Sequence, residues 1–149
     1  MEEGDRLMRY WLFKSEPDVF GWDDLVATGA KGEEWDGVRN YQARNNMREM
    51  KIGDRGLFYH SNIGKEVVGI VEVCAEAHHD SSTEDPRWEC VDIRAVAPVK
   101  TPVTLDQAKA EPRLKDMILV NNSRLSVQPV SEAEWAVVME LAGMDGIKA

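Results

Sequence analysis

The chain has 149 residues, 43% of them hydrophobic and 30% charged, with 18 basic and 27 acidic side chains and a formal net charge of −9. This length and composition predict one globular domain, and no apolar run approaches the ~18 residues of a transmembrane helix. The negative charge argues against a simple nonspecific duplex binder, because such proteins carry a basic surface.

The chain begins with an acidic segment that lacks the basic start and apolar stretch of a signal peptide. We predict a flexible extension at residues 1–8 and one folded domain at residues 9–145. Both cysteines lie in strand-like segments and are expected to be buried and reduced. We therefore expect a cytoplasmic protein with no membrane partner, and a monomer.

The first half of the chain predicts two strands and two helices. Residues 10–14 have the composition of a strand, which ends before a proline because proline disfavours the helical conformation in its predecessor. Residues 22–27 predict a short helix between two glycines. In residues 40–50 the apolar side chains recur at helical spacing and leave the arginines on another face. Residues 55–60 predict the next strand.

The second half predicts two strands and two capped helices. Residues 65–77 are apolar on both sides, which indicates burial on both faces of a sheet; residues 61–64 suit a hairpin loop before them. Residues 88–96 alternate between apolar and polar side chains. Capping-box patterns at Thr104 and Ser131 open two helices. The elements lack a βαβ rhythm, so we predict an α+β fold with an antiparallel, barrel-like sheet.

Residues 34–45 hold the least core-like mixture in the chain: a tryptophan, two carboxylates, two arginines and three amide side chains. Trp35 offers a flat face for stacking, Asp36 and Asn40 suit the edge of a heterocycle, and the arginines suit phosphate. Residues 39–55 carry five basic and two acidic side chains. A small basic patch on an acidic body predicts few phosphate contacts and a pocket, and it suits a free nucleoside equally. The alternative is a helix N-terminus with a tryptophan packed beneath it.

The chain contains four motifs in a fixed order: YWLFKSEP at 10–17, WDGVRNYQARN at 35–45, FYHS at 58–61 and RLSVQPV at 124–130. Together they resemble the EVE domain family. The resemblance implies a PUA-like mixed or antiparallel β-barrel with flanking short helices, related to the YTH domains that bind methylated adenine in RNA. It also implies a non-enzymatic reader of a modified nucleobase in DNA or RNA.

The likeness to YTH domains further implies which residues surround the base. Trp35 is expected to form one wall of an aromatic pocket, and Trp88 is a second candidate for stacking. Arg39, Arg44 and Arg48 are expected to contact phosphate. For the charged members of the set, the alternative is an internal salt-bridge network. The residues implied for base binding are Lys14, Ser15, Glu16, Trp35, Asp36, Val38, Arg39, Asn40, Tyr59, His60, Ser61, Asn62, Trp88, Arg124 and Ser126.

Other chemistry has weaker support, and we expect no catalytic residue, metal or cofactor. His60 and Ser61 are neighbours in a strand and so point to opposite faces, which does not suit a base and its nucleophile. Residues 78–80 lack metal-ligand spacing and are expected to begin a solvated loop. The expected partner is single-stranded DNA or RNA, or a flipped-out base. The alternatives are a binder of a free modified nucleoside or other small metabolite, and then a small hydrolase of modified nucleotides.

Overall fold

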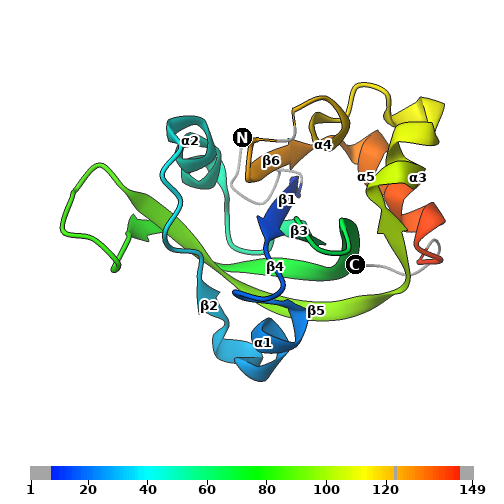
Figure 1. Cartoon of the computed structure of the whole chain (residues 1–149). Coiled ribbons are helices and arrows are strands. Elements are labelled where there is room, and N and C mark those ends of the chain that lie inside the picture. Colours follow the sequence, from blue (N-terminus) through cyan, green and yellow to red (C-terminus); the bar gives the residue numbers. More distant parts are fainter. Residues whose placement is uncertain (1–7, 123, 145–149) are drawn as a thin grey trace.

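Six strands form one mixed sheet in the computed structural model, which describes residues 8–122 and 124–144 (Figure 1). Hydrogen-bonded neighbours follow the order β2-β5-β4-β3-β1-β6. The β1–β3 pair is parallel and the other pairs are antiparallel. The strands are β1 (Tyr10–Ser15), β2 (Glu33–Glu34), β3 (Arg55–His60), β4 (Glu66–His79), β5 (Glu89–Thr104) and β6 (Val127–Val130).

Short helices cover both faces of this sheet, so the predicted α+β class is confirmed. The sheet curves but does not close, because β2 and β6 stand at its two edges. The barrel-like sheet of the sequence prediction is therefore an open one. The helices are α1 (Trp22–Ala27), α2 (Tyr41–Glu49), α3 (Leu105–Ala110), α4 (Ile118–Asn121) and α5 (Glu132–Leu141), with short 3-10 helices η2 (Gly29–Lys31) and η3 (Pro112–Leu114).

Alternation along β1 sends its side chains into two separate cores. Trp11 and Phe13 are fully buried on the face covered by α1 and α2, whereas Leu12 is fully buried on the face covered by α3, α4 and α5. Helices on both faces explain why every residue in the middle of this strand is apolar. The expected burial of both faces of β4 has the same cause.

The predicted faces of β4 are wrong in part. Simple alternation puts Val67 and Val71 on one side, yet Val67 packs with α3 to α5 and Val71 packs in the other core. Val68 is an extra residue in β4, where the registers with β3 and with β5 both shift, and this bulge turns the following side chains of β4 over. Gly69 has no room for a side chain, because a Cβ there would lie 2.3 Å from the Trp22 ring.

Local signals located α1, α2, α3 and α5 but missed α4, and they placed the end of β5 too early. The side chains of Thr104 and Ser131 accept hydrogen bonds from the backbone three residues on, as the capping-box patterns predict. β5 continues to Thr104, well past the predicted end at residue 96, and contains Pro98. On its outer side β5 pairs with β2 only at Ile93 and its neighbour. At Pro98 this side of β5 has no partner strand, so the N–H that proline lacks is not needed there.

None of the described helices has the length and apolar character needed to span a bilayer. The predicted extension at residues 1–8 lies outside the described residues except for Met8. The predicted domain end at residue 145 also lies outside them.

Candidate functional site

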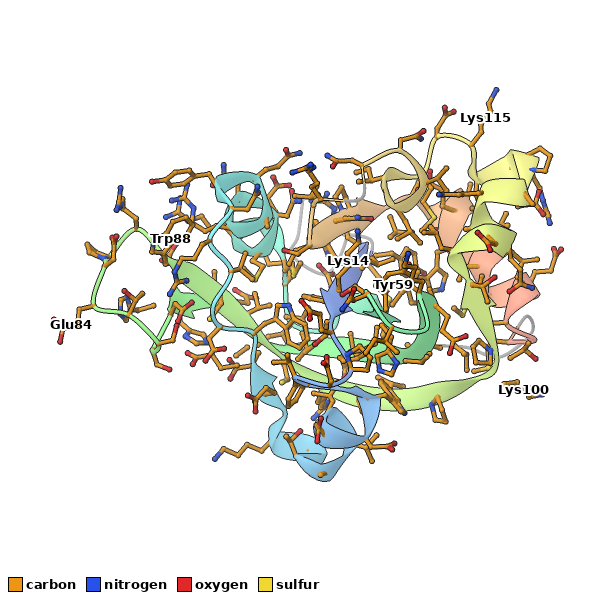
Figure 2. The ribbon with its side chains drawn as sticks, viewed as in Figure 1. Lys14, Tyr59, Glu84, Trp88, Lys100 and Lys115 are labelled. Atoms are coloured by element: carbon orange, nitrogen blue, oxygen red, sulfur yellow. The ribbon has the colours of Figure 1, made fainter. Side chains whose placement is uncertain are left out.

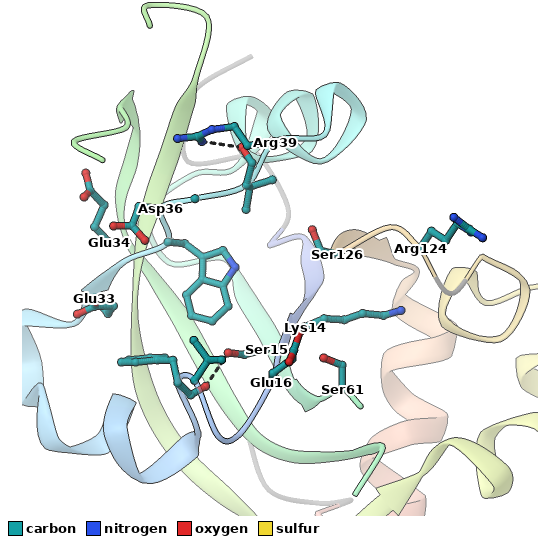
Figure 3. Close-up of a pocket in the computed structure, with 15 residues that line it drawn as sticks. Lys14, Ser15, Glu16, Glu33, Glu34, Asp36, Arg39, Ser61, Arg124 and Ser126 are labelled. Carbon is teal, nitrogen blue, oxygen red and sulfur yellow. Dashed lines mark hydrogen bonds between the residues drawn. The ribbon is translucent and has the colours of Figure 1, made fainter. Parts of the chain in front are cut away.

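A cavity of about 730 Å³ lies where β1 ends, between the segment after β2 and the segment before β6 (Figure 3). Its size falls within the range of small-molecule sites, which is ~300–1,000 Å³. Most residues implied for base binding meet here although they come from distant parts of the chain. The lining consists of Lys14, Ser15, Glu16, Val19, Phe20, Glu33, Glu34, Trp35, Asp36, Gly37, Val38, Arg39, Ser61, Arg124 and Ser126.

Backbone pairing at the end of β1 brings three of these segments together. The Lys14 N–H donates to the Ser126 carbonyl at 2.9 Å, and the Ser61 N–H donates to the Ser15 carbonyl at 2.9 Å. The Ser15 hydroxyl donates to the Phe20 carbonyl at 2.6 Å and so ties the turn after β1 to the strand. The sheet therefore holds the cavity's donors and acceptors in fixed places.

Trp35 lies at the cavity but is mostly embedded in the protein. It is 8% exposed, and its ring makes edge-to-face contacts with Phe13, Phe20 and Phe58 at centroid distances of 5.6, 6.1 and 5.8 Å. The Trp35 backbone N–H donates to the Val91 carbonyl at 2.8 Å. The sequence prediction places Trp35 beside Lys14 and Ser61, and the structure brings them to one cavity. Its role as a stacking wall stays a prediction.

Asp80 anchors the loop that follows Trp35. Its carboxylate accepts hydrogen bonds from the Gly37 N–H at 2.9 Å and from Arg39 Nη1 at 3.1 Å, while the Ser82 N–H donates at 2.8 Å. Although burial opposes it, these bonds and that of the Ser82 hydroxyl lower the pKa of Asp80 to about 2. The expectation of a solvated loop at residues 78–80 is wrong, because His78 and His79 end β4 and Asp80 is 1% exposed. The Gly37 backbone and the Arg39 side chain, both distant from Asp80 in sequence, bind its carboxylate.

The cavity is electrostatically divided. Figure 3 shows Glu33, Glu34 and Asp36 on the side opposite Lys14 and Arg124, while Glu16 lies beside Lys14. Burial and the neighbouring carboxylates raise the pKa of Glu33 and of Asp36, and burial lowers the pKa of Lys14. Carboxylates accept hydrogen bonds from amino and imino groups, and cations bind phosphate. The two sides therefore suit the two ends of a nucleotide.

Two predicted site residues have structural roles away from the cavity. The Asn40 side chain accepts a hydrogen bond from the Ala43 N–H at 2.8 Å and caps α2. Tyr59 is 3% exposed and belongs to the core beneath α3 to α5. It meets the cavity only through Lys14, whose Nζ lies 5.8 Å from the centroid of its ring. Alternation along β3 explains this, because Tyr59 and Phe58 point to opposite faces.

His60 and Asn62 also lie outside the cavity lining. His60 Nε2 accepts a hydrogen bond from the Trp22 backbone N–H at 3.1 Å, and burial lowers the pKa of His60, so its neutral form is favoured. Asn62 sits in the β3–β4 loop with a positive φ of 69°. Ser61 lines the cavity while His60 binds the start of α1. These neighbours therefore do not form the base–nucleophile pair that the hydrolase alternative requires.

Trp88 and two of the arginines expected to bind phosphate lie on a neighbouring surface. Trp88 stacks on Tyr41 at a centroid distance of 4.9 Å. Arg48 forms a salt bridge with Glu89 at 2.5 Å. Arg44 donates hydrogen bonds to two neutral oxygens, the Asn45 side-chain oxygen and the Arg87 carbonyl. Arg39 lines the cavity and pairs with Asp80, so for Arg39 the salt-bridge alternative also holds.

Two groups of side chains bring possible metal ligands within 4.8 Å of one another: Glu34, Asp36 and Asp80, and Glu34, His78 and Cys90. Asp80 already accepts several hydrogen bonds, and His78 Nε2 is bound to Asp92 Oδ1 at 2.8 Å. We assign no metal to either group.

Sequence reasoning missed several cavity residues for identifiable reasons. Val19 and Phe20 lie in an irregular turn, and Glu33 and Glu34 form a strand too short to show any period. Gly37 carried the one available signal, because a glycine within a polar motif often adopts positive φ, and its φ is 83°. Asp80 acts through the backbone of this glycine, so only the fold reveals it.

Comparisons with known proteins agree with this architecture. The chain is 57% identical to protein Atu2648 from Agrobacterium tumefaciens, with a TM-score of 0.92 over 95% of this chain and 98% of that one. It is 36% identical to thymocyte nuclear protein 1 from Mus musculus, over 93% of this chain and 75% of that protein. The chain is 34% identical in sequence to human THYN1 protein, whose crystal structure was determined in complex with 5-methylcytosine containing DNA, and the TM-score is 0.81 over 90% of this chain and 97% of that one.

A more distant likeness concerns the fold alone. The YTH domain of Zygosaccharomyces rouxii MRB1 protein is 17% identical to this chain, with a TM-score of 0.55 over 91% of this chain and 86% of that one. The sheet is thus of the PUA-like type that the sequence motifs imply. Residues 9–141 match the model of the EVE domain, so this chain belongs to the EVE domain family.

Proposed function

We propose that this protein is a non-enzymatic module that binds nucleic acid containing a modified base, and that the base enters the cavity beside Trp35. The observation that carries the proposal is the divided cavity itself. An aromatic side chain lines it, three carboxylates (Glu33, Glu34 and Asp36) stand on one side, and Lys14 and Arg124 stand on the other together with Glu16. The human relative crystallised with 5-methylcytosine containing DNA supports this class of ligand.

The charge of the cavity supports a role for each part. The half-buried Glu33 and the exposed Asp36 would accept hydrogen bonds from the edge of a base. Lys14 and Arg124 would neutralise a phosphate or hold polar groups of the sugar. A single nucleoside fits the volume of about 730 Å³, whereas a base stacked inside a duplex is enclosed by its neighbours and cannot reach into a cavity. A base in a duplex would therefore have to flip out of the helix.

Fluorescence anisotropy with labelled oligonucleotides tests the proposal. The probes are matched DNA and RNA strands, single and duplex, that carry cytosine, 5-methylcytosine, adenine or N6-methyladenine at one position. We expect one modified strand to bind more tightly than its unmodified match. Arg124→Gln should weaken that binding, whereas Arg113→Gln should not, because Arg113 pairs with Glu111 and Glu140 away from the cavity. Equal binding of every modified and unmodified pair would refute the proposal.

Trp35 provides a second test. Base–aromatic stacking is worth ~1–3 kcal/mol, so Trp35→Ala should weaken binding about tenfold or more. Because Trp35 packs against three phenylalanines, the alanine variant should also lose ~3–5 kcal/mol of folding stability. Trp35→Phe keeps an aromatic face and more of the packing, so it should stay folded and lose less affinity. Circular dichroism shows which variants are folded.

A free modified nucleoside is the second candidate ligand, and the net charge of −9 favours it because a long strand would be repelled. Isothermal titration with 5-methyldeoxycytidine and with the matching oligonucleotide separates the two ligands. Tighter binding of the nucleoside would favour the second candidate. We expect the protein to act as a monomer in the cytoplasm.

A further inference from the structure

An aromatic pair stands beside the cavity and takes no part in lining it. Tyr41, the first residue of α2, stacks on Trp88 with a centroid distance of 4.9 Å and an interplanar angle of 22°. Figure 2 shows Trp88 between α2 and the β4–β5 loop. Trp88 is 8% exposed, whereas Tyr41 is 48% exposed. Trp88 is therefore the buried support of the pair, and Tyr41 is its solvent-facing member.

Tyr41 is 48% exposed although Trp88 covers one face of its ring. Arg44 Cζ lies over the Tyr41 ring, 4.8 Å from its centroid, and 5.9 Å from the Trp88 centroid. Because the two ring centroids are 4.9 Å apart, these distances set Arg44 toward the side of the stack and not squarely above the outer face of Tyr41. Arg87 Nη1 donates to the Tyr41 hydroxyl at 3.1 Å and fixes the ring at its edge. The exposed part of the ring is thus held in place beside Arg44.

Arg44 is the cation beside this ring that can meet a phosphate without losing an ion pair. Its guanidinium donates to the Asn45 side-chain oxygen and to the Arg87 carbonyl, both neutral. Within residues 8–122 and 124–144, its neighbours Arg39, Arg48 and Arg87 each pair with a carboxylate, and Arg44 forms no such pair. A phosphate at Arg44 would gain a charge-assisted hydrogen bond.

Arg39 connects this surface to the cavity. It lines the cavity, and its Cζ lies 5.4 Å from the Trp88 centroid. Arg39 thus touches both the cavity and the aromatic pair, so a strand that leaves the cavity past Arg39 would meet Tyr41 and Trp88. An exposed, supported aromatic face beside a cation is the recurring element of single-strand binding sites, because every base has a face that can stack.

We propose that Tyr41, supported by Trp88, stacks the base adjacent to the one in the cavity, and that Arg44 holds the phosphate beside it. This inference rests on the proposed function and makes it more specific, since it requires a strand as the ligand. It also explains how an acidic protein retains a strand with few phosphate contacts. This second position should accept any base, because stacking does not depend on which base is present.

The test compares a short single-stranded DNA containing one 5-methylcytosine with free 5-methyldeoxycytidine, using isothermal titration. Tyr41→Ala should lower affinity for the strand about tenfold and leave affinity for the nucleoside unchanged. Tyr41→Phe is the matched control, because it keeps the ring face and should bind the strand like the unaltered protein. Arg44→Gln should make the salt dependence of strand binding shallower by about one phosphate contact.

The outcomes separate this inference from the proposed function. Strand affinity unchanged by Tyr41→Ala would overturn the inference while leaving the cavity proposal standing. An equal loss for strand and nucleoside would also overturn it, since Tyr41 would then act on the cavity. If the unaltered protein bound the nucleoside and not the strand, the second surface would be excluded. Binding of neither probe would count against both proposals.

Discussion

Replacing Asp80 by asparagine removes the charge that holds residues 36–39 against the β4–β5 loop. The carboxylate is 1% exposed and accepts hydrogen bonds from Gly37, Arg39 and Ser82. These bonds lower its pKa from 3.8 to about 2. Each pKa unit between the folded and unfolded states corresponds to about 1.4 kcal/mol, so the ionised carboxylate contributes ~2–3 kcal/mol of folding stability at neutral pH.

The sign of the pH dependence follows from the lowered pKa. The contribution is complete above about pH 5, where the unfolded carboxyl group is almost fully ionised, and is lost progressively as the pH falls through the unfolded and then the folded value. Urea unfolding at pH 7 should therefore give Asp80→Asn a free energy of unfolding lower by ~2–3 kcal/mol. The difference between the two proteins should stay constant down to about pH 5 and narrow below it.

A matched control lies on the same loop. The pKa of Asp85 is also lowered to about 2, by hydrogen bonds from Arg87, but this pair is solvent-exposed, so Asp85→Asn should change stability little. Equal stability of the Asp80→Asn variant and the unaltered protein at pH 7 would refute the reasoning. So would a stability difference that is the same at every pH.

Three further predictions concern other parts of the structure. Gly69→Ala should lower the free energy of unfolding by ~1–3 kcal/mol, because its Cβ would overlap the Trp22 ring; urea denaturation measures this, and a neutral result would contradict the close approach. Burial alone would lower the pKa of His78, but hydrogen bonds to Asp92 and the His79 carbonyl raise it. An NMR titration should therefore show His78 titrating above 6.5, with a stabilising effect present below that pH and lost as the pH rises through the folded pKa. Arg48→Gln should alter the salt dependence of strand binding less than Arg44→Gln, because Arg48 is already paired with Glu89.

The sequence predicted what is encoded locally. Helix caps at Thr104 and Ser131 could be located because the capping side chain and its partner are three residues apart. The strand composition of residues 10–14 was equally clear. β6 contains Pro129, which obscures the strand pattern, and β2 is two residues long. These two edge strands depend on their neighbours in the sheet and have no periodic signal of their own.

The same distinction between local and distant signals holds for the residues of the candidate site. Lys14, Ser61 and Trp35 were placed together by motif order, and the cavity contains all three. Asn40 and Tyr59 belong to the same motifs but face elsewhere, because a helix cap and the alternation of a strand decide their directions. The roles of Asp80 and Tyr41 arise from contacts between segments some forty residues apart. Such contacts become visible only in the folded protein.

The pairing of β1 with both β3 and β6 has a consequence for the order of folding. β1 lies near the start of the chain and β6 near its end, and the cavity forms where the two meet. A ribosome-bound chain that lacks β6 cannot complete the cavity, and closing so long a loop makes this pairing slow relative to local hairpins. Ligand binding therefore reports on assembly of the whole domain, and shortening the chain before residue 127 should abolish it.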